Sequence, residues 1–169
     1  LEELYDKFIK LADKKKRVDD RDLVSLVTDK SLESHTSATF ELVHAQVTCG
    51  SSGLPTASVM LKDQRDKTNL LKGAELGTGP VDAICKCIRK LTRAECTLIE
   101  FSVKSVTEGI DSLGEVIIRI KDDISKTIYT GHAANTDILL ASAQAYLNAV
   151  NRYFEKREST KLNPQASEV

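Results

Sequence analysis

The segment Gly77-Thr78-Gly79-Pro80-Val81-Asp82-Ala83-Ile84-Cys85-Lys86-Cys87-Ile88 contains the change of pattern on which the fold prediction depends. Proline is favoured in the first turn of a helix, so Pro80 is well placed to begin one. Apolar residues then recur at helical spacing, namely Val81, Ile84, Cys85, Ile88 and Leu91. We therefore predict a helix over residues 80–92 with one buried face.

Before this helix the pattern is that of β-strands. Residues 39–48 are rich in β-branched and apolar side chains, and residues 49–53, Cys-Gly-Ser-Ser-Gly, are typical of a turn. Residues 56–61 predict a second strand, and a third, weaker one lies within 67–76. The unit predicted up to residue 92 is therefore β-β-β-α.

The same order of elements returns downstream. Strands are predicted over 95–106, 115–121 and 125–130, with a turn at 108–111, and a long helix is predicted from residue 135. Lys62-Asp63 aligns with Lys121-Asp122 and Gly73 with Gly131, a repeat of about 58 residues. The sequence thus predicts an α+β fold with two β-β-β-α units, 38–92 and 95–158, related by pseudo-twofold symmetry. A sheet covered by a single helix has apolar surface that stays uncovered and strand edges that stay unpaired, which favours a homodimer.

The flanking segments differ from this domain. Residues 1–30 have apolar residues at helical spacing and predict a small helical connecting subdomain, followed by a polar linker over 31–37. Residues 159–169 lack periodicity and predict a loose tail. Because the helical pattern starts at residue 1 without Met, we expect the chain to be a piece of a longer protein.

Composition excludes several classes of function. The formal net charge is -1, so no basic field favours nucleic acid, and no run approaches the roughly 20 apolar residues of a membrane span. No histidine lies at ligand spacing from the four cysteines, Cys49, Cys85, Cys87 and Cys96. We expect no nucleic-acid partner, no membrane, no metal site, and reduced thiols in a cytoplasmic protein.

The sequence contains no recognisable catalytic motif. No nucleophile stands with a base, no phosphate loop is present, and His35, His44 and His132 are scattered. We therefore predict no catalytic residue in this chain.

Two junctions that lead into helices remain as candidate binding sites, at residues 77–82 and 131–137. The start of a helix exposes backbone N–H groups and a partial positive charge, so it can hold a small carboxylate. Asp82 and Asp137 then have two alternative roles. Each either stabilises its helix start or helps to hold an ammonium group, so that loop and acid grip a free amino acid.

Four ordered segments resemble a known family. Residues 77–83 are similar to the G-x-GPVDA segment of the C-terminal regulatory domain of α-isopropylmalate synthases and citramalate synthases. Residues 45–57 resemble the first hairpin of that domain, 105–116 its middle hairpin, and 136–149 its final helix. The resemblance implies a dimeric domain that binds the pathway's end product, leucine or isoleucine, and so inhibits a distant catalytic barrel. That barrel condenses acetyl-CoA with a 2-oxo acid, needs a divalent metal, and lies outside this chain.

Carried onto this sequence, the resemblance implies an effector site formed by the first junction and the strand after the helix. The residues are Gly77, Gly79, Pro80, Val81, Asp82, Leu98, Phe101 and Ser105. The alternative for Leu98 and Phe101 is ordinary core. Leucine and isoleucine both stay open, with a preference for isoleucine and citramalate synthase that no residue decides. A purely structural dimerisation module without ligand is the alternative function.

Overall fold

The computed structural model describes residues 38–162 except 52, 67–68 and 106–112. The chain divides into two compact units, 1–37 and 38–169, and the described residues all belong to the second. The helical subdomain and linker predicted over residues 1–37 therefore lie outside the described residues, as does the end of the predicted tail, 163–169.

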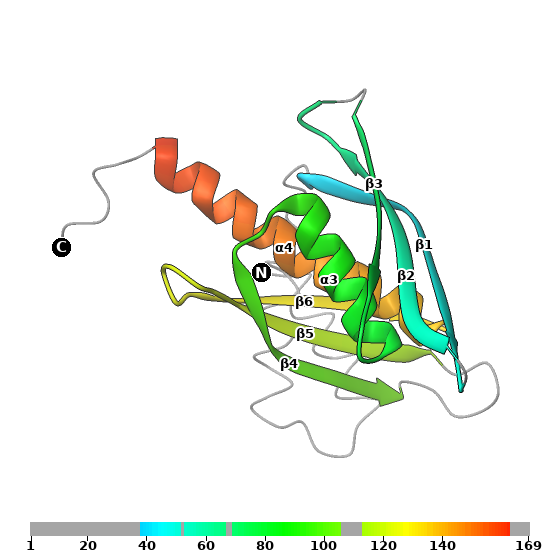
Figure 1. The fold of residues 1–169 in the computed structure, drawn as a ribbon. Helices are drawn as coiled ribbons and strands as arrows, with labels where there is room; N and C mark the ends of the chain where they lie inside the picture. Colours follow the sequence, from blue (N-terminus) through cyan, green and yellow to red (C-terminus); the bar gives the residue numbers. More distant parts are fainter. Residues whose placement is uncertain (1–37, 52, 67–68, 106–112, 163–169) are drawn as a thin grey trace, which may run out of the picture. The chain divides into compact units, whose positions relative to one another are not determined.

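The described unit has two successive β-β-β-α motifs (Figure 1). The first comprises β1 (Phe40–Gly50), β2 (Gly53–Asp63), β3 (Leu70–Leu76) and α3 (Pro80–Thr92). The second comprises β4 (Cys96–Ser105), β5 (Gly114–Asp122), β6 (Ile128–Asn135) and α4 (Ile138–Leu162). Each sheet is antiparallel in the order of its sequence. The predicted α+β fold of two such units is confirmed.

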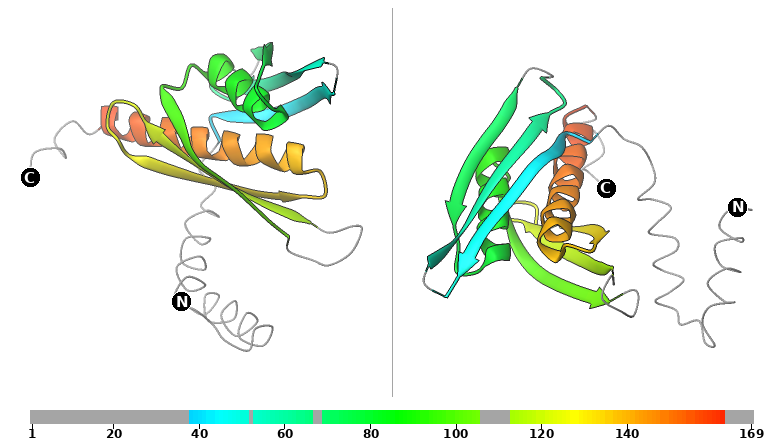
Figure 2. Two further views of the ribbon diagram at one scale, coloured as in Figure 1. Left: turned by 60° about the horizontal axis from the view of Figure 1, so that its bottom comes forward. Right: turned by 90° about the vertical axis from the view of Figure 1, so that its right-hand side faces the viewer.

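The core lies between the two sheets, where α3 and α4 pack against each other (Figure 2). Helix α3 covers β2 and β3, whereas α4 covers β5 and β6 and also reaches β1. Alternate residues of the two central strands point at the helices, as the period of a strand requires. They are almost fully buried: Ala57, Val59, Leu61, Val116, Ile118 and Ile120.

The glycines aligned in the repeat each allow a helix to approach the third strand of its sheet. A Cβ on Gly131 would lie 1.9 Å from the carbonyl oxygen of Ala145 in α4. A Cβ on Gly73 would lie 3.0 Å from Leu91 in α3, at the equivalent contact. The internal alignment therefore reflects a shared packing contact between helix and sheet.

Two boundaries in the second unit differ from the prediction. Strand β6 spans Ile128–Asn135 instead of 125–130, so the predicted junction at 131–135 is strand, and α4 begins at Ile138 instead of 135. Gly131, Ala133 and Ala134 have weak intrinsic strand preference, so tertiary packing decides their conformation. At Gly131 a residue without a side chain is needed because α4 crosses this strand so closely.

Helix α4 also continues to Leu162, so residues 159–162 are helical where a loose tail was predicted. Its last turns, Glu155-Lys156-Arg157-Glu158 and onward, carry no apolar stripe. Glutamate, lysine and arginine are nevertheless good helix formers, and they extend a helix already anchored by Phe154. Among the described helices, none is long and apolar enough to cross a membrane.

Candidate functional site: a cleft at the starts of two helices

The start of α3 carries no side-chain cap. Gly79 is its N-cap, with an extended backbone (φ -154°, ψ 170°), and its carbonyl accepts the first helical hydrogen bond from the N–H of Ala83 at 3.0 Å. No heavy atom lies within 4 Å of the position a Cβ would take on Gly79. The first turn of α3 therefore offers backbone donors that Gly79 does not cap, beside open space.

Gly77 has a different role from Gly79. Its N–H donates to the carbonyl of Pro55 at 2.9 Å, which ties the junction to β2. A Cβ on Gly77 would lie 2.3 Å from the backbone nitrogen of Ala83. Glycine is therefore required at residue 77 by close packing, whereas residue 79 tolerates a side chain.

Asp82 stabilises the start of α3. Its carboxylate accepts hydrogen bonds from the Thr78 N–H at 2.8 Å and the Thr78 hydroxyl at 3.2 Å, and it pairs with Lys86 at 2.7 Å. The hydrogen bond from Lys86, followed by that from the Thr78 backbone, lowers the pKa of Asp82. These contacts fit the first of the two predicted roles, stabilisation of the helix start.

Asp137 caps α4 in the same region. Its Oδ1 accepts the N–H of Leu139 at 2.8 Å and that of Leu140 at 3.2 Å, and its own N–H donates to Asn135 Oδ1 at 2.9 Å. The first amides of α4 are thus already bound by a carboxylate of the protein. The two helix starts differ in consequence: α3 presents uncapped amides, whereas α4 presents an acidic side chain.

A cleft of about 260 Å³ lies between strand β1, the second turn of α3 and the start of α4. The predicted site residues of the first junction, Gly77, Gly79, Pro80, Val81 and Asp82, are not among its lining residues. Its lining comes from three elements: Ala45, Gln46 and Val47 of β1, Ile84 of α3, and Asp137, Leu139 and Leu140 at the start of α4. Five of the seven lining residues are aliphatic, but the surface exposed to the cleft is more polar than apolar, and Asp137 contributes one negative charge. The volume is just below the roughly 300–1,000 Å³ of pockets for drug-sized ligands, and therefore suits a molecule the size of an amino acid.

The predicted strand residues lie on a different surface. Leu98, Phe101 and Ser105 pair in register with Ile120, Ile118 and Gly114, on the helix-facing side of sheet β4-β5-β6. They do not line the cleft at the helix starts. Phe101 is 40% exposed and Leu98 37%, so neither is ordinary core within a single chain.

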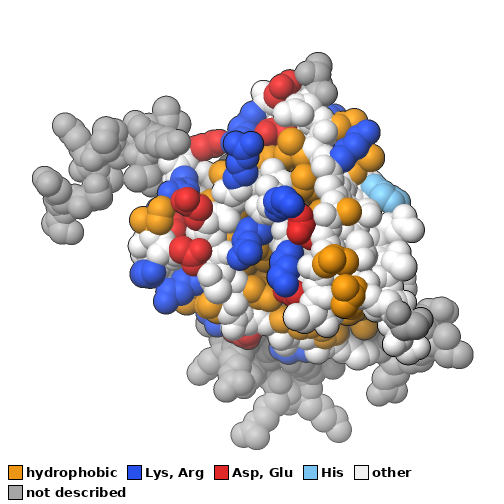
Figure 3. Space-filling model, viewed as in Figure 1, with side chains coloured by type: hydrophobic (Ala, Val, Ile, Leu, Met, Phe, Trp, Pro, Cys, Tyr) orange, Lys and Arg blue, Asp and Glu red, His pale blue; other side chains and the backbone are white. Residues whose placement is uncertain are grey.

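Strand β4 is less covered than β1. The first residue of each strand is buried, with Phe40 2% exposed and Cys96 1% exposed. Farther along β1, Leu42, Ala45 and Val47 pack against the core, whereas no hydrophobic side chain of the described β4 beyond Cys96 does so. The result is a row of exposed apolar side chains on β4, namely Leu98, Ile99, Phe101 and Val103. Figure 3 shows hydrophobic side chains along the lower part of the described surface, where β4 runs, below a charged region over α3.

Sequence reasoning missed most of the residues that line the cleft. Ile84 carried only the signal of a helix core, and Ala45, Gln46 and Val47 only that of a strand. The cleft is formed by three elements far apart in sequence, so no local pattern marks it. The one usable signal was Asp137, which the second junction had already singled out.

The cysteines behave as packed thiols in the part of the chain that the structure describes. Cys85, Cys87 and Cys96 are buried and Cys49 is exposed, all unpaired. Burial raises the pKa of Cys85 to about 12, so this thiol is not a reactive thiolate. No group of three His, Cys, Asp or Glu side chains among the described residues is arranged to hold a metal ion.

Comparison with known families agrees with this architecture of paired units. The LeuA allosteric (dimerisation) domain matches residues 17–154. The chain belongs to this family. It is similar to the 2-isopropylmalate synthases of two strains of Prochlorococcus marinus, one 47% identical over 165 residues and the other 49% identical over 167 residues. The 2-isopropylmalate synthase of a Synechococcus species is 43% identical over 169 residues.

The match covers nearly all of this chain but only part of each relative. It includes 98% of the chain for both Prochlorococcus proteins and 100% for the Synechococcus protein, but 30% of each relative. These relatives are isopropylmalate synthases, so the preference for a citramalate synthase gains no support from them.

Proposed function

We propose that this chain is the feedback-regulatory and dimerisation domain of a 2-isopropylmalate synthase, and that leucine is its effector. The observation that carries the proposal is the cleft between β1, Ile84 of α3 and the Asp137-capped start of α4, about one turn of helix from the uncapped start of α3. The names of the relatives favour leucine over isoleucine.

In this proposal a branched-chain amino acid bridges the cleft and the nearby start of α3. Its carboxylate would extend beyond the cleft lining to the backbone amides at the start of α3, where Gly79 leaves space. Its ammonium would lie near Asp137, and its side chain against Val47, Ile84 and Leu139. Burial of a leucine-sized side chain contributes about 1.5–3 kcal/mol. Together these groups select a zwitterion with an aliphatic side chain.

Catalysis in this proposal belongs to the remainder of the full-length protein. A barrel outside this chain would condense acetyl-CoA with a 2-oxo acid and would hold the divalent metal. Among the described residues, no group of three His, Cys, Asp or Glu side chains is placed to hold that metal. The role of the described residues in this proposal is to bind the effector and to lower the catalytic activity of the barrel.

For the dimerisation role we propose that β4 of one chain meets a second copy. Its apolar side chains are unpartnered within the described unit, and β4 is an edge strand of its sheet. A contiguous apolar surface on a strand edge is a site of association between chains. In a symmetric pair each chain would bury the Leu98–Val103 face of its partner.

Addition of leucine is expected to raise the melting temperature of the domain. A ligand that binds only the folded state stabilises it by RT ln(1 + [L]/Kd), about 2.7 kcal/mol at a hundredfold excess over Kd. Thermal melts with leucine, isoleucine, valine, acetyl-CoA and a 2-oxo acid test this. We expect a shift with leucine and none with acetyl-CoA or the 2-oxo acid. If no branched-chain amino acid shifts the melt, the alternative holds and the chain is a structural dimerisation module.

A further inference from the structure

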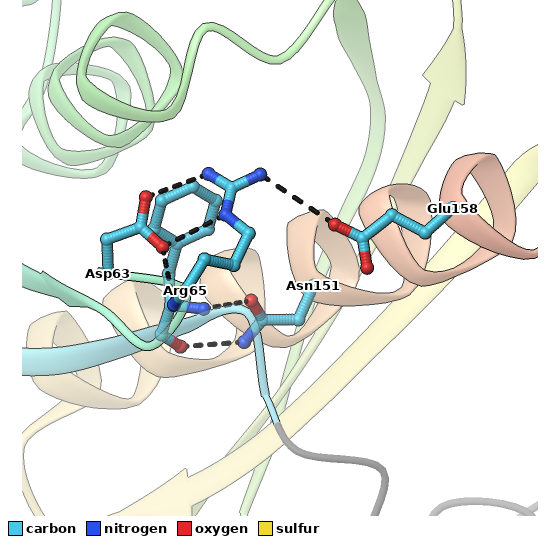
Figure 4. A network of polar contacts seen from close by, with 5 residues as sticks. Asp63, Arg65, Asn151 and Glu158 are labelled. Carbon is cyan, nitrogen blue, oxygen red and sulfur yellow. Dashed lines mark hydrogen bonds and ion pairs between the residues drawn. The ribbon is translucent and has the colours of Figure 1, made fainter. Parts of the chain in front are cut away.

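The backbone of the first strand is held by one side chain of the last helix. Asn151 of α4 donates its amide Nδ2 to the carbonyl of Phe40 at 2.9 Å, and its Oδ1 accepts the Phe40 N–H at 2.8 Å (Figure 4). Phe40 begins β1, so this residue lies where the chain from residues 1–37 enters the domain. The paired hydrogen bonds join residues that are 111 positions apart.

A second set of contacts surrounds Phe40. Arg65 binds Asp63 with two hydrogen bonds, of 3.0 Å and 2.8 Å, and reaches Glu158 of α4 at 3.8 Å (Figure 4). Its guanidinium lies 4.9 Å from the ring centre of Phe40 and 5.6 Å from that of Phe154. The hydrogen bond from Arg65 lowers the pKa of Asp63, so the pair stays charged at neutral pH. Phe40, Asp63, Arg65, Asn151, Phe154 and Glu158 together form what we call the clasp.

The equivalent point of the second unit is built differently among the described residues. Cys96 occupies the register position of Phe40, opposite Asp122 instead of Asp63. Asp122 accepts its hydrogen bonds from Ile124 and Ser125 within its own turn, whereas the nearby Arg157 pairs with Glu95 at 3.6 Å. The clasp is therefore a feature of the point where residues 1–37 join the domain, and not a general requirement of the repeat.

Helix α4 connects the clasp to the cleft proposed for the effector. Its first turn contributes Asp137, Leu139 and Leu140 to the cleft, and its later turns contribute Asn151, Phe154 and Glu158 to the clasp. The helix has 25 residues, roughly 37 Å at 1.5 Å per residue. Its middle turns, at Ala145 and Ala149, pack closely on Gly131, so we expect the helix to respond to effector at its start as one stiff element.

We propose that Asn151 is a positioning residue that couples effector binding to inhibition. It holds the backbone of Phe40, where the chain enters the domain, to α4, so that a change in α4 on effector binding also changes the position of Phe40. This rests on the proposed function, because it assumes that leucine binds at the start of α4. A variant could then keep effector binding and still lose inhibition. Loss of the paired bonds to Phe40 leaves the cleft intact, yet releases the start of β1 from the helix.

The test uses the full-length enzyme that contains this chain, with Asn151→Ala compared with Asn148→Ala. Asn148 is a matched control, since it lies on the same helix and donates to a strand carbonyl, that of His132, at 2.9 Å. Leucine binding is measured by calorimetry and inhibition by synthase activity. For Asn151→Ala we expect a leucine Kd within about threefold of the wild-type value. At saturating leucine we expect the variant to keep about half or more of its uninhibited synthase activity, because binding is no longer coupled to inhibition. Asn148→Ala is expected to keep both binding and inhibition.

Full inhibition of Asn151→Ala at saturating leucine would overturn the proposal, as would equal loss of binding and inhibition. If Asn151→Ala fails to fold, Glu158→Gln is tested instead. Glu158 and Arg65 are both about half exposed and their ion pair contributes little to stability, so this variant is expected to fold. It should raise the activity that remains at saturating leucine, and no change would count against the clasp. Wild-type enzyme that neither binds leucine nor is inhibited by it would instead refute the proposed function.

Discussion

Gly131 in β6 and Gly79 at the start of α3 are constrained in different ways. Gly131 lies against the backbone of α4, where a Cβ would come within 1.9 Å of Ala145 and 2.6 Å of Ala149. Gly79 faces open space with an extended backbone, so neither packing nor a left-handed conformation requires glycine there. What Gly79 leaves is access to the start of a helix, and that fits a binding role better than a structural one.

Substitution Gly131→Ala is expected to destabilise the domain by about 1–3 kcal/mol or more, because the added methyl forces α4 away from β6. Gly79→Ala is the control and should cost less, about 0.5–1 kcal/mol, because alanine is a poorer N-cap than glycine but meets no neighbour within 4 Å. Urea unfolding of both variants gives the measurement. Equal stability of Gly131→Ala and wild type would show that the helix is not seated on this strand as described.

At the scale of elements, strands and helices with a strong period were predictable from sequence. Helix α3 was predicted over 80–92 and spans Pro80–Thr92, because proline and an apolar stripe mark it. Strand β6 was misplaced because Gly131, Ala133 and Ala134 resemble a loop in sequence, whereas pairing with β5 makes them a strand. The end of α4 was missed because its last turns are polar. Local pattern fails where tertiary contact decides.

Strand β4 is where the dimer proposal can be tested. Phe101→Glu places a charge in the exposed apolar face and should leave the fold intact, since Phe101 is already 40% exposed. We expect this variant to be a monomer at micromolar concentration in light scattering, whereas wild type is a dimer, because a desolvated, unpaired charge opposes association. Leu54→Glu, at an exposed apolar position on β2, should remain a dimer. A dimeric Phe101→Glu would move the interface elsewhere.

At the scale of the whole molecule, the internal repeat was enough to predict two β-β-β-α units. The alignment of Gly73 with Gly131 has a packing cause in each unit. The cleft could not be predicted in the same way, because the sequence does not state how the two units face each other. The sequence-based site combined the start of α3 with β4, whereas the cleft joins Ile84 in the second turn of α3 to β1 and the start of α4.

Calorimetric titration of the domain with leucine measures whether the cleft between β1, α3 and α4, with the nearby start of α3, binds a branched-chain amino acid. We expect saturable binding to wild type and to Gly79→Asn, since residue 79 has room for a side chain. Gly79→Asp should lose binding while remaining folded, because its carboxylate repels that of the ligand at the start of α3. Absence of binding to wild type for leucine, isoleucine and valine alike would contradict the account, and so would undiminished leucine binding to a folded Gly79→Asp.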